Sequence, residues 1–142
     1  MNVDLVFNGR IPYSGTYVDA KRISNPVKAD AHYLPFKDEA FSFVYSRAML
    51  EHIDSPTKGL KEMIRVARNE VLFIVPHRFF RRGILKGQPE THKYFFSTLA
   101  TKNWVRKCVG YTPITRIVYK GFPSEVLSLV RLPWLIEVNI KK

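Results

Sequence analysis

A continuous apolar run in the middle of the chain limits the possible folds more than any other part of the sequence. Residues 71–75 read Val-Leu-Phe-Ile-Val, and Pro76 follows them. Because side chains alternate between the two faces of a strand, this run predicts a strand over residues 70–75 that is buried on both faces. Such burial is typical of a central strand in a parallel sheet that helices cover.

Two amphipathic helices are predicted around this strand. Ser55 offers a capping hydroxyl, and Pro56 suits the first position of a helix. The apolar stripe that follows has helical spacing and consists of Leu60, Met63, Ile64 and Ala67. Asn69 is predicted to end this helix in a left-handed conformation. The second helix is predicted to begin after Ser97 or Thr98, and one of its faces carries Thr101, Trp104, Val105 and Cys108.

Shorter strands complete the predicted pattern. In residues 41–46, aromatic side chains alternate with the smaller side chains of serine and valine. This alternation predicts a strand with one aromatic face and one face of smaller residues. Further strands are predicted at residues 3–7, 16–18 and 27–29, and the tail is predicted as a strand at 115–120, a short helix at 124–130 and a strand at 134–140. Strands that alternate with helices predict an α/β fold, here one domain over residues 1–142, and the two tail strands predict an antiparallel edge.

The composition removes several classes of protein. A single cysteine, Cys108, excludes a framework of internal disulfides. His77, His92 and Cys108 lack the spacing of metal ligands, so no metal site is predicted. No apolar run approaches the roughly 18 residues of a membrane span, and the N-terminal residues do not resemble a signal peptide. The sequence therefore predicts a cytoplasmic protein.

The net positive charge of the chain lies almost entirely in its second half. Residues 1–70 carry ten Lys and Arg against nine Asp and Glu, whereas residues 71–142 carry thirteen against three. This asymmetry favours an acidic partner, such as a nucleic acid or a phosphorylated small molecule. A solvated basic face is the alternative interpretation, since charge alone does not define a partner.

An ordered series of short motifs runs through residues 27–66. It consists of Asp30-Ala31, Leu34-Pro35-Phe36, Asp38, Phe41, Val44, Ser46, Leu50-Glu51-His52, Glu62 and Arg65-Val66. The series resembles class I S-adenosylmethionine-dependent methyltransferases, in particular the small-molecule, type 11-like enzymes related to ubiquinone and menaquinone biosynthesis. Upstream, Tyr17-Val18-Asp19 is similar to the family's second strand with its final acidic residue. The resemblance implies a Rossmann-like methyltransferase sheet that is minimal or truncated.

The resemblance also implies a cofactor, S-adenosylmethionine, and residues that contact it. Ligands of an open parallel sheet bind beyond the carboxyl ends of its strands. The implied contacts are Asp19 with the ribose hydroxyls, Asp30 and Ala31 with the adenine edge, Leu34 and Phe36 with the adenine face, and Ser46 and Arg47 with the methionine part. Taken alone, each carboxylate is more often a turn or capping residue. His52 is expected to pack locally, and Glu62 and Arg65 to pair along one helix.

One departure from the family concerns the glycine-rich loop after the first strand. The region before Asp19 offers Asn8-Gly9 and Gly15 but no G-x-G arrangement. Residues 8–15 are also too few for a helical crossover between parallel strands, which needs roughly a dozen residues. A methyltransferase-fold module that has lost the cofactor and binds nucleic acid or a protein partner is therefore a second hypothesis.

The loop after the predicted central strand is strongly basic. It contains Arg78, Arg81 and Arg82 among aromatic residues, a pattern that suits phosphate contact and base stacking in a substrate site. A solvated loop is the alternative. If the acceptor needs a general base, the candidates are His77, His92 and Tyr94. A homodimer would cover apolar surface that a small domain with an incomplete cofactor site leaves exposed, but the sequence does not decide between a monomer and a homodimer.

Overall fold

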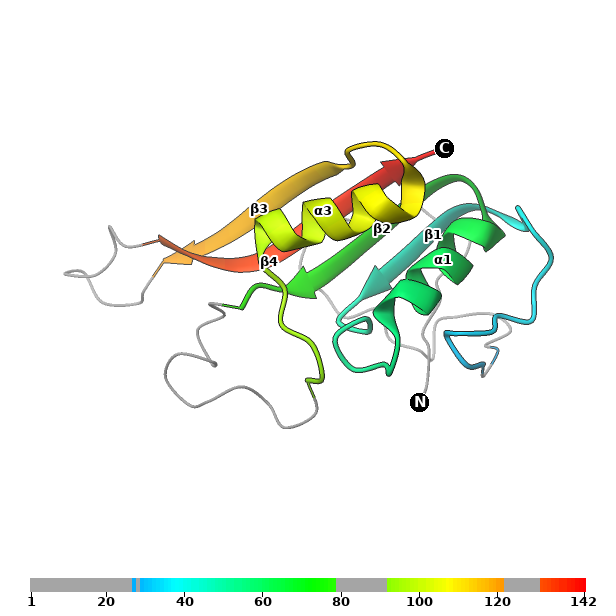
Figure 1. The fold of residues 1–142 in the computed structure, drawn as a ribbon, viewed down its shortest axis with the longest axis horizontal. Helices are drawn as coiled ribbons and strands as arrows, with labels where there is room; N and C mark the ends of the chain where they lie inside the picture. Colours follow the sequence, from blue (N-terminus) through cyan, green and yellow to red (C-terminus); the bar gives the residue numbers. More distant parts are fainter. Residues whose placement is uncertain (1–26, 28, 79–91, 122–130) are drawn as a thin grey trace.

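The computed structural model describes residues 27, 29–78, 92–121 and 131–142 (Figure 1). Its sheet has four strands, β1 (Phe41–Arg47), β2 (Ala67–Pro76), β3 (Ile114–Gly121) and β4 (Arg131–Lys141), in the order β1-β2-β4-β3. β1 and β2 are parallel, whereas β4 is antiparallel to both β2 and β3. The predicted α/β class and the antiparallel C-terminal edge are confirmed.

Two described helices, α1 (Pro56–Val66) and α3 (Thr98–Val109), lie on the same face of this sheet (Figure 1). A hydrogen bond joins them, because the Trp104 indole N–H donates to the Thr57 hydroxyl oxygen at 2.9 Å. The Trp104 ring also contacts Phe73 of β2 and Phe96, with ring centroids 6.1 and 5.7 Å away. The face of α3 that contains Trp104 therefore packs toward the sheet, as predicted.

Helix α1 begins where the sequence predicts, but it ends before the predicted residue. The Ser55 hydroxyl accepts a hydrogen bond from the Lys58 N–H, and Pro56 is the first helical residue. The helix ends at Val66, and Ala67 already begins β2, so the predicted left-handed stop at Asn69 is wrong. Asn69 is extended inside β2, where its carbonyl oxygen accepts from the Lys142 N–H. Pairing with the sheet thus replaces a separate helix-ending turn.

The core lies between the sheet and the two helices. β2 is central to it, with Val71, Leu72, Phe73 and Val75 all buried, so the prediction of burial on both faces is confirmed. The α1 residues Leu60, Met63 and Val66 and the β4 residues Ile136, Val138 and Ile140 are also buried. In β1 the buried face is the one with Val44 and Ser46, while the aromatic face is partly exposed.

The predicted strand at residues 27–29 is not found at Val27 or Ala29, which belong to no strand. The chain turns immediately afterward, since the Asp30 carbonyl oxygen accepts from the Tyr33 N–H at 3.0 Å. The predicted strands at 3–7 and 16–18 and the predicted helix at 124–130 lie outside the described residues. Neither described helix has the length and apolar character that a membrane crossing requires.

Candidate functional site

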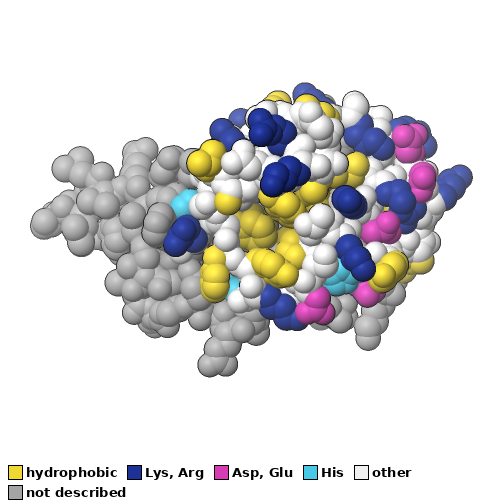
Figure 2. Space-filling view, viewed as in Figure 1, with side chains coloured by type: hydrophobic (Ala, Val, Ile, Leu, Met, Phe, Trp, Pro, Cys, Tyr) yellow, Lys and Arg dark blue, Asp and Glu magenta, His cyan; other side chains and the backbone are white. Residues whose placement is uncertain are grey.

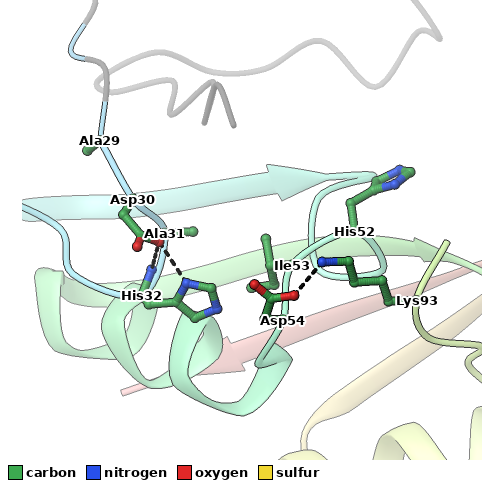
Figure 3. Close-up of a pocket in the computed structure, with 8 residues that line it drawn as sticks. All are labelled: Ala29, Asp30, Ala31, His32, His52, Ile53, Asp54 and Lys93. Carbon is green, nitrogen blue, oxygen red and sulfur yellow. Dashed lines mark hydrogen bonds and ion pairs between the residues drawn. The ribbon is translucent and has the colours of Figure 1, made fainter. Parts of the chain in front are cut away.

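A pocket of about 510 Å³ lies between the Asp30 turn and the loop that leaves the carboxyl end of β1 (Figure 3). The described residues that line it are Ala29, Asp30, Ala31, His32, His52, Ile53, Asp54 and Lys93. Figure 3 shows Asp30 and His32 on one side of the pocket and Asp54 and Lys93 on the other. Two of the predicted cofactor residues, Asp30 and Ala31, therefore belong to one concave site.

A chain of hydrogen bonds through His32 fixes the Asp30 carboxylate. Asp30 Oδ1 accepts from the His32 backbone N–H at 2.9 Å and lies 2.7 Å from His32 Nδ1. On the other side of the ring, His32 Nε2 accepts from the Ser55 N–H at 3.1 Å. An acceptor at Nε2 requires the proton of a neutral imidazole at Nδ1, so the ring donates to Asp30. The backbone and ring donors of His32 lower the pKa of Asp30, which keeps this carboxylate ionised.

The opposite wall joins two segments that are distant in the sequence. Lys93 Nζ forms an ion pair with Asp54, and the Tyr94 hydroxyl donates to the Asp54 carbonyl oxygen at 2.6 Å. The Glu51 carbonyl oxygen accepts from the Lys93 N–H at 2.8 Å and from the Tyr94 N–H at 3.3 Å. These contacts hold residues 92–94 against the loop after β1. The prediction missed Asp54 and Lys93, although Asp54 stands two residues after the Leu50-Glu51-His52 motif and Lys93 stands next to the candidate base His92.

A clamp on α1 holds the segment that follows the Asp30 turn. Arg65 pairs with Glu62 through two hydrogen bonds of 2.8 and 2.7 Å, and with Asp38 at 2.8 Å. The same guanidinium donates to the carbonyl oxygens of Leu34 and Phe36, and Glu62 accepts from the Leu34 N–H. The expected pairing of Glu62 with Arg65 is confirmed. Both side chains also bind the segment before β1, which the prediction did not include.

This clamp gives Leu34 and Phe36 packing roles. Leu34 is buried in the core, and the Phe36 ring packs edge-on against Phe41 at a centroid distance of 4.9 Å. Neither residue is among the described lining of the pocket. The reason is that the carbonyl oxygens of both residues are directed to Arg65, which draws the segment toward α1. Their contact with adenine stays a prediction.

The end of β1 carries the next pair of predicted residues. Ser46 is buried in the strand and Arg47 is exposed as its last residue. Ala48 follows in the left-handed region, with a φ of 53°, and its N–H donates to the Ile74 carbonyl oxygen of β2. A non-glycine residue in this conformation is uncommon, and such strain persists where the surroundings enforce it. The loop toward His52 thus leaves β1 through a sharp, fixed bend.

The three candidate bases occupy different surroundings. His77 is buried at the end of β2, beside Phe96, and burial lowers its pKa. His92 packs on the pocket residue His52 with ring centroids 4.7 Å apart, and burial lowers the pKa of His92 as well. Tyr94 is partly exposed and bonded to Asp54. His92 and Tyr94 thus lie on the segment that forms the pocket wall, whereas His77 is not part of the described lining.

Several predicted residues lie outside the described part of the chain. These are the ribose-binding candidate Asp19 and the substrate-binding candidates Arg81 and Arg82. Arg78 is described and exposed, and its N–H donates to the Phe96 carbonyl oxygen at 2.6 Å. This hydrogen bond joins Arg78, the last described residue before the basic loop, to the segment that precedes α3.

The described sheet, with its parallel β1–β2 pair and antiparallel edge, shares the fold of S-adenosylmethionine-dependent methyltransferases of known structure. A methyltransferase from Thermotoga maritima superposes with a TM-score of 0.63 at 23% identity, over 86% of this chain and 66% of that one. A methyltransferase from Bacillus halodurans gives 0.56 at 16% identity, over 80% and 68%. Magnesium protoporphyrin IX methyltransferase from Synechocystis, solved with bound S-adenosylhomocysteine, gives 0.55 at 12% identity, over 82% and 50%.

A comparison of sequences points to the same family. Residues 12–75 match the family model described as a methyltransferase domain, so the resemblance predicted from the motifs is confirmed. No curated protein sequence shows significant similarity to the chain. The chain spans 66% of the Thermotoga protein and 50% of the Synechocystis enzyme, which makes it shorter than these whole methyltransferases.

Proposed function

We propose that the chain binds S-adenosylmethionine beside Asp30 and transfers its methyl group to an acceptor. The observation that carries this proposal is that Asp30 and Ala31, which the resemblance assigns to the adenine, line a pocket of about 510 Å³. The pocket borders the loop at the carboxyl end of β1, the edge at which open α/β sheets bind their ligands. The match of residues 12–75 to a methyltransferase domain supports the same function.

The described lining fits a nucleoside-bearing cofactor. Its volume lies in the usual range of small-molecule sites, and Ala29, Ala31 and Ile53 supply apolar surface. The Asp30 side chain is 60% exposed, and both His32 contacts use its Oδ1, so Oδ2 can accept from an exocyclic amine. Asp19 would bind the ribose hydroxyls, and Ser46 and Arg47 would lie near the methionine part. The bound cofactor supplies an electrophilic methyl group on a sulfonium.

The residues of the chain have two tasks in such a transfer. They must hold the nucleophile of the acceptor in line with the methyl carbon, which is a matter of proximity and orientation. They must also accept a proton when the acceptor is a weak nucleophile. Burial lowers the pKa of His92 and of His77, which favours the neutral imidazole that can accept a proton. Tyr94 is the third candidate.

We propose an acidic, phosphorylated or nucleic-acid-like acceptor. The second half of the chain carries the basic excess, Lys93 is in the pocket lining, and Arg78 is exposed where the basic loop begins. Arg81 and Arg82 would extend this contact. On the face that carries the helices, Lys and Arg side chains are spread rather than gathered in one patch (Figure 2). We therefore assign the acidic group of the acceptor to Lys93 and the basic loop rather than to the face that carries the helices.

A cofactor-free binding module is the second candidate function, favoured by the missing G-x-G arrangement before Asp19. Calorimetric titration of the full chain with S-adenosylmethionine separates the two functions. Methyltransferase function predicts saturable binding at micromolar concentration and a loss of affinity of about tenfold or more in Asp30→Ala. Asp38→Ala is the matched control, because Asp38 is a carboxylate of the same segment that binds Arg65 instead.

Two results would reject the methyltransferase proposal. One is the absence of binding at millimolar cofactor in a folded protein. The other is an equal loss of affinity in the Asp30 and Asp38 variants, which would indicate a general effect on folding. Binding of a nucleic acid that weakens steeply with salt, without any cofactor binding, would support the second candidate function.

A further inference from the structure

Three potential metal ligands meet beside the pocket. One ligand atom each from Glu51, His52 and His92 lies within 4.8 Å of the other two. Glu51 Oε1 is 3.9 Å from His52 Nε2, and the two imidazole rings meet edge-on with centroids 4.7 Å apart. Glu51 and His52 follow β1, whereas His92 comes from a segment forty residues later in the sequence. Sequence spacing therefore gives no sign of this cluster.

The Glu51 carboxylate is buried without a hydrogen-bond partner among the described residues. Only 1% of this residue is exposed, and neither Oε1 nor Oε2 has a partner there. His92 Nδ1 is likewise buried and unpartnered in the described part of the chain. A buried ionised carboxylate costs several kcal/mol unless a cation or hydrogen-bond donors compensate it. The cluster therefore brings three potential electron-pair donors together around a buried carboxylate that has no hydrogen-bond donor among the described residues.

The backbone around the cluster is already fixed. The Glu51 carbonyl oxygen accepts from the Lys93 and Tyr94 N–H groups, and the His52 N–H donates to the Met49 carbonyl oxygen at 3.0 Å. Asp54 binds the Lys93 ammonium and the Tyr94 hydroxyl. These bonds hold both segments together without using the three donor atoms. The three donor atoms already lie within 4.8 Å of one another, compared with separations of about 3.3 Å between the ligand atoms of a tetrahedral zinc site.

We propose that Glu51, His52 and His92 bind a divalent transition-metal ion. One carboxylate and two imidazoles are a common ligand set for zinc, and they also suit manganese and iron in the divalent state. Three protein ligands leave at least one coordination position for a water or a ligand atom. Because His52 also lines the pocket, that position borders the proposed cofactor and acceptor site. Metal binding does not depend on the methyltransferase proposal.

Zinc titration of the metal-stripped, tag-free full chain tests this site. We expect one equivalent of Zn²⁺ to bind with micromolar or tighter affinity and to raise the Tm. Glu51→Gln and His92→Gln should each weaken the affinity at least tenfold. His32→Gln is the matched control, because it also removes a pocket histidine but lies outside the cluster, and it should bind zinc as the unaltered chain does.

Co²⁺ supplies a second readout, since its visible absorption reports coordination by these ligands even where a variant is less stable. The proposal is overturned if the folded chain shows no saturable zinc binding at millimolar concentration. It is also overturned if Glu51→Gln and His92→Gln bind zinc like the unaltered chain, or if His32→Gln loses the site equally. Every titration omits S-adenosylmethionine, so failure here is distinguishable from failure of the methyltransferase proposal.

Discussion

Arg65 and Asp38 form an ion pair of 2.8 Å that ties the segment before β1 to helix α1. The same guanidinium binds Glu62 and two backbone carbonyl oxygens of that segment. The motif around Leu34 and the motif around Arg65, separate in the sequence, are therefore one structural unit. Much of the family resemblance lies in this unit, which follows the Asp30 turn in the sequence.

Replacing Arg65 should destabilise the protein. Arg65→Lys retains the charge but cannot reproduce the forked pairing with Glu62, so we expect the Tm to fall by roughly 5 °C or more. Arg65→Ala should lower it further, because the Leu34 and Phe36 carbonyl oxygens lose their donor as well. Thermal unfolding followed by circular dichroism measures the effect. Arg68→Ala, at an exposed position in β2, is the control and should change little.

A second prediction concerns the core. Leu60 is fully buried on α1, so Leu60→Ala should cost about 2–5 kcal/mol of unfolding free energy through lost burial and the cavity that remains. Leu99 is 71% exposed on α3, and Leu99→Ala should stay within about 0.5 kcal/mol. Urea unfolding of both variants compares the two values. Equal losses would show that the packing described for α1 is wrong.

The buried Glu51 should make stability depend on pH. Burial raises its pKa above the ordinary value of 4.5, so the native state retains this proton to higher pH than the unfolded chain does. Stability from this group is therefore complete below pH 4.5 and falls as the pH rises through the native pKa. In the absence of metal, Glu51→Gln should remove this decline. Urea unfolding in EDTA across a pH series tests it, and an unchanged decline in the variant would refute it.

At Gly59, helix α1 lies close to Ile53 of the loop that follows β1. A Cβ at this position would stand 2.5 Å from Ile53 Cδ1, so Gly59→Ala should force the Ile53 side chain to move. Alanine gains up to about 1 kcal/mol of helix propensity, which offsets part of that cost. Because Ile53 lines the pocket, we expect cofactor affinity to fall several-fold while the Tm changes little. The exposed Lys61→Ala on the same helix should leave the affinity unchanged.

The elements with strong local signals could be predicted from the sequence. Ser55 and Pro56 predicted the start of α1, and the apolar run at Val71–Val75 predicted β2. Both predictions rest on capping and burial patterns, which are local properties of the sequence. The end of α1 could not be predicted in this way. Asn69 favours a turn locally, but its pairing in the sheet keeps it extended.

Only part of the candidate site could be predicted from the sequence. Asp30 and Ala31 were predicted through the resemblance, and both line the pocket. Lys93 and His92 reach the site through tertiary contacts with Asp54 and His52, which no spacing rule encodes. Leu34 was predicted as a site residue from its family motif, but in the structure it packs in the core and its carbonyl oxygen binds Arg65.

The position of the bound cofactor on the protein can be determined in solution. Backbone amide chemical shifts can be followed by NMR while the isotope-labelled chain is titrated with S-adenosylhomocysteine. If the cofactor binds in the pocket, the shift changes should be saturable and largest at residues 29–32 and 52–54, on the two sides of the pocket. Changes confined to the antiparallel edge of β3 and β4, or none at millimolar ligand, would contradict it.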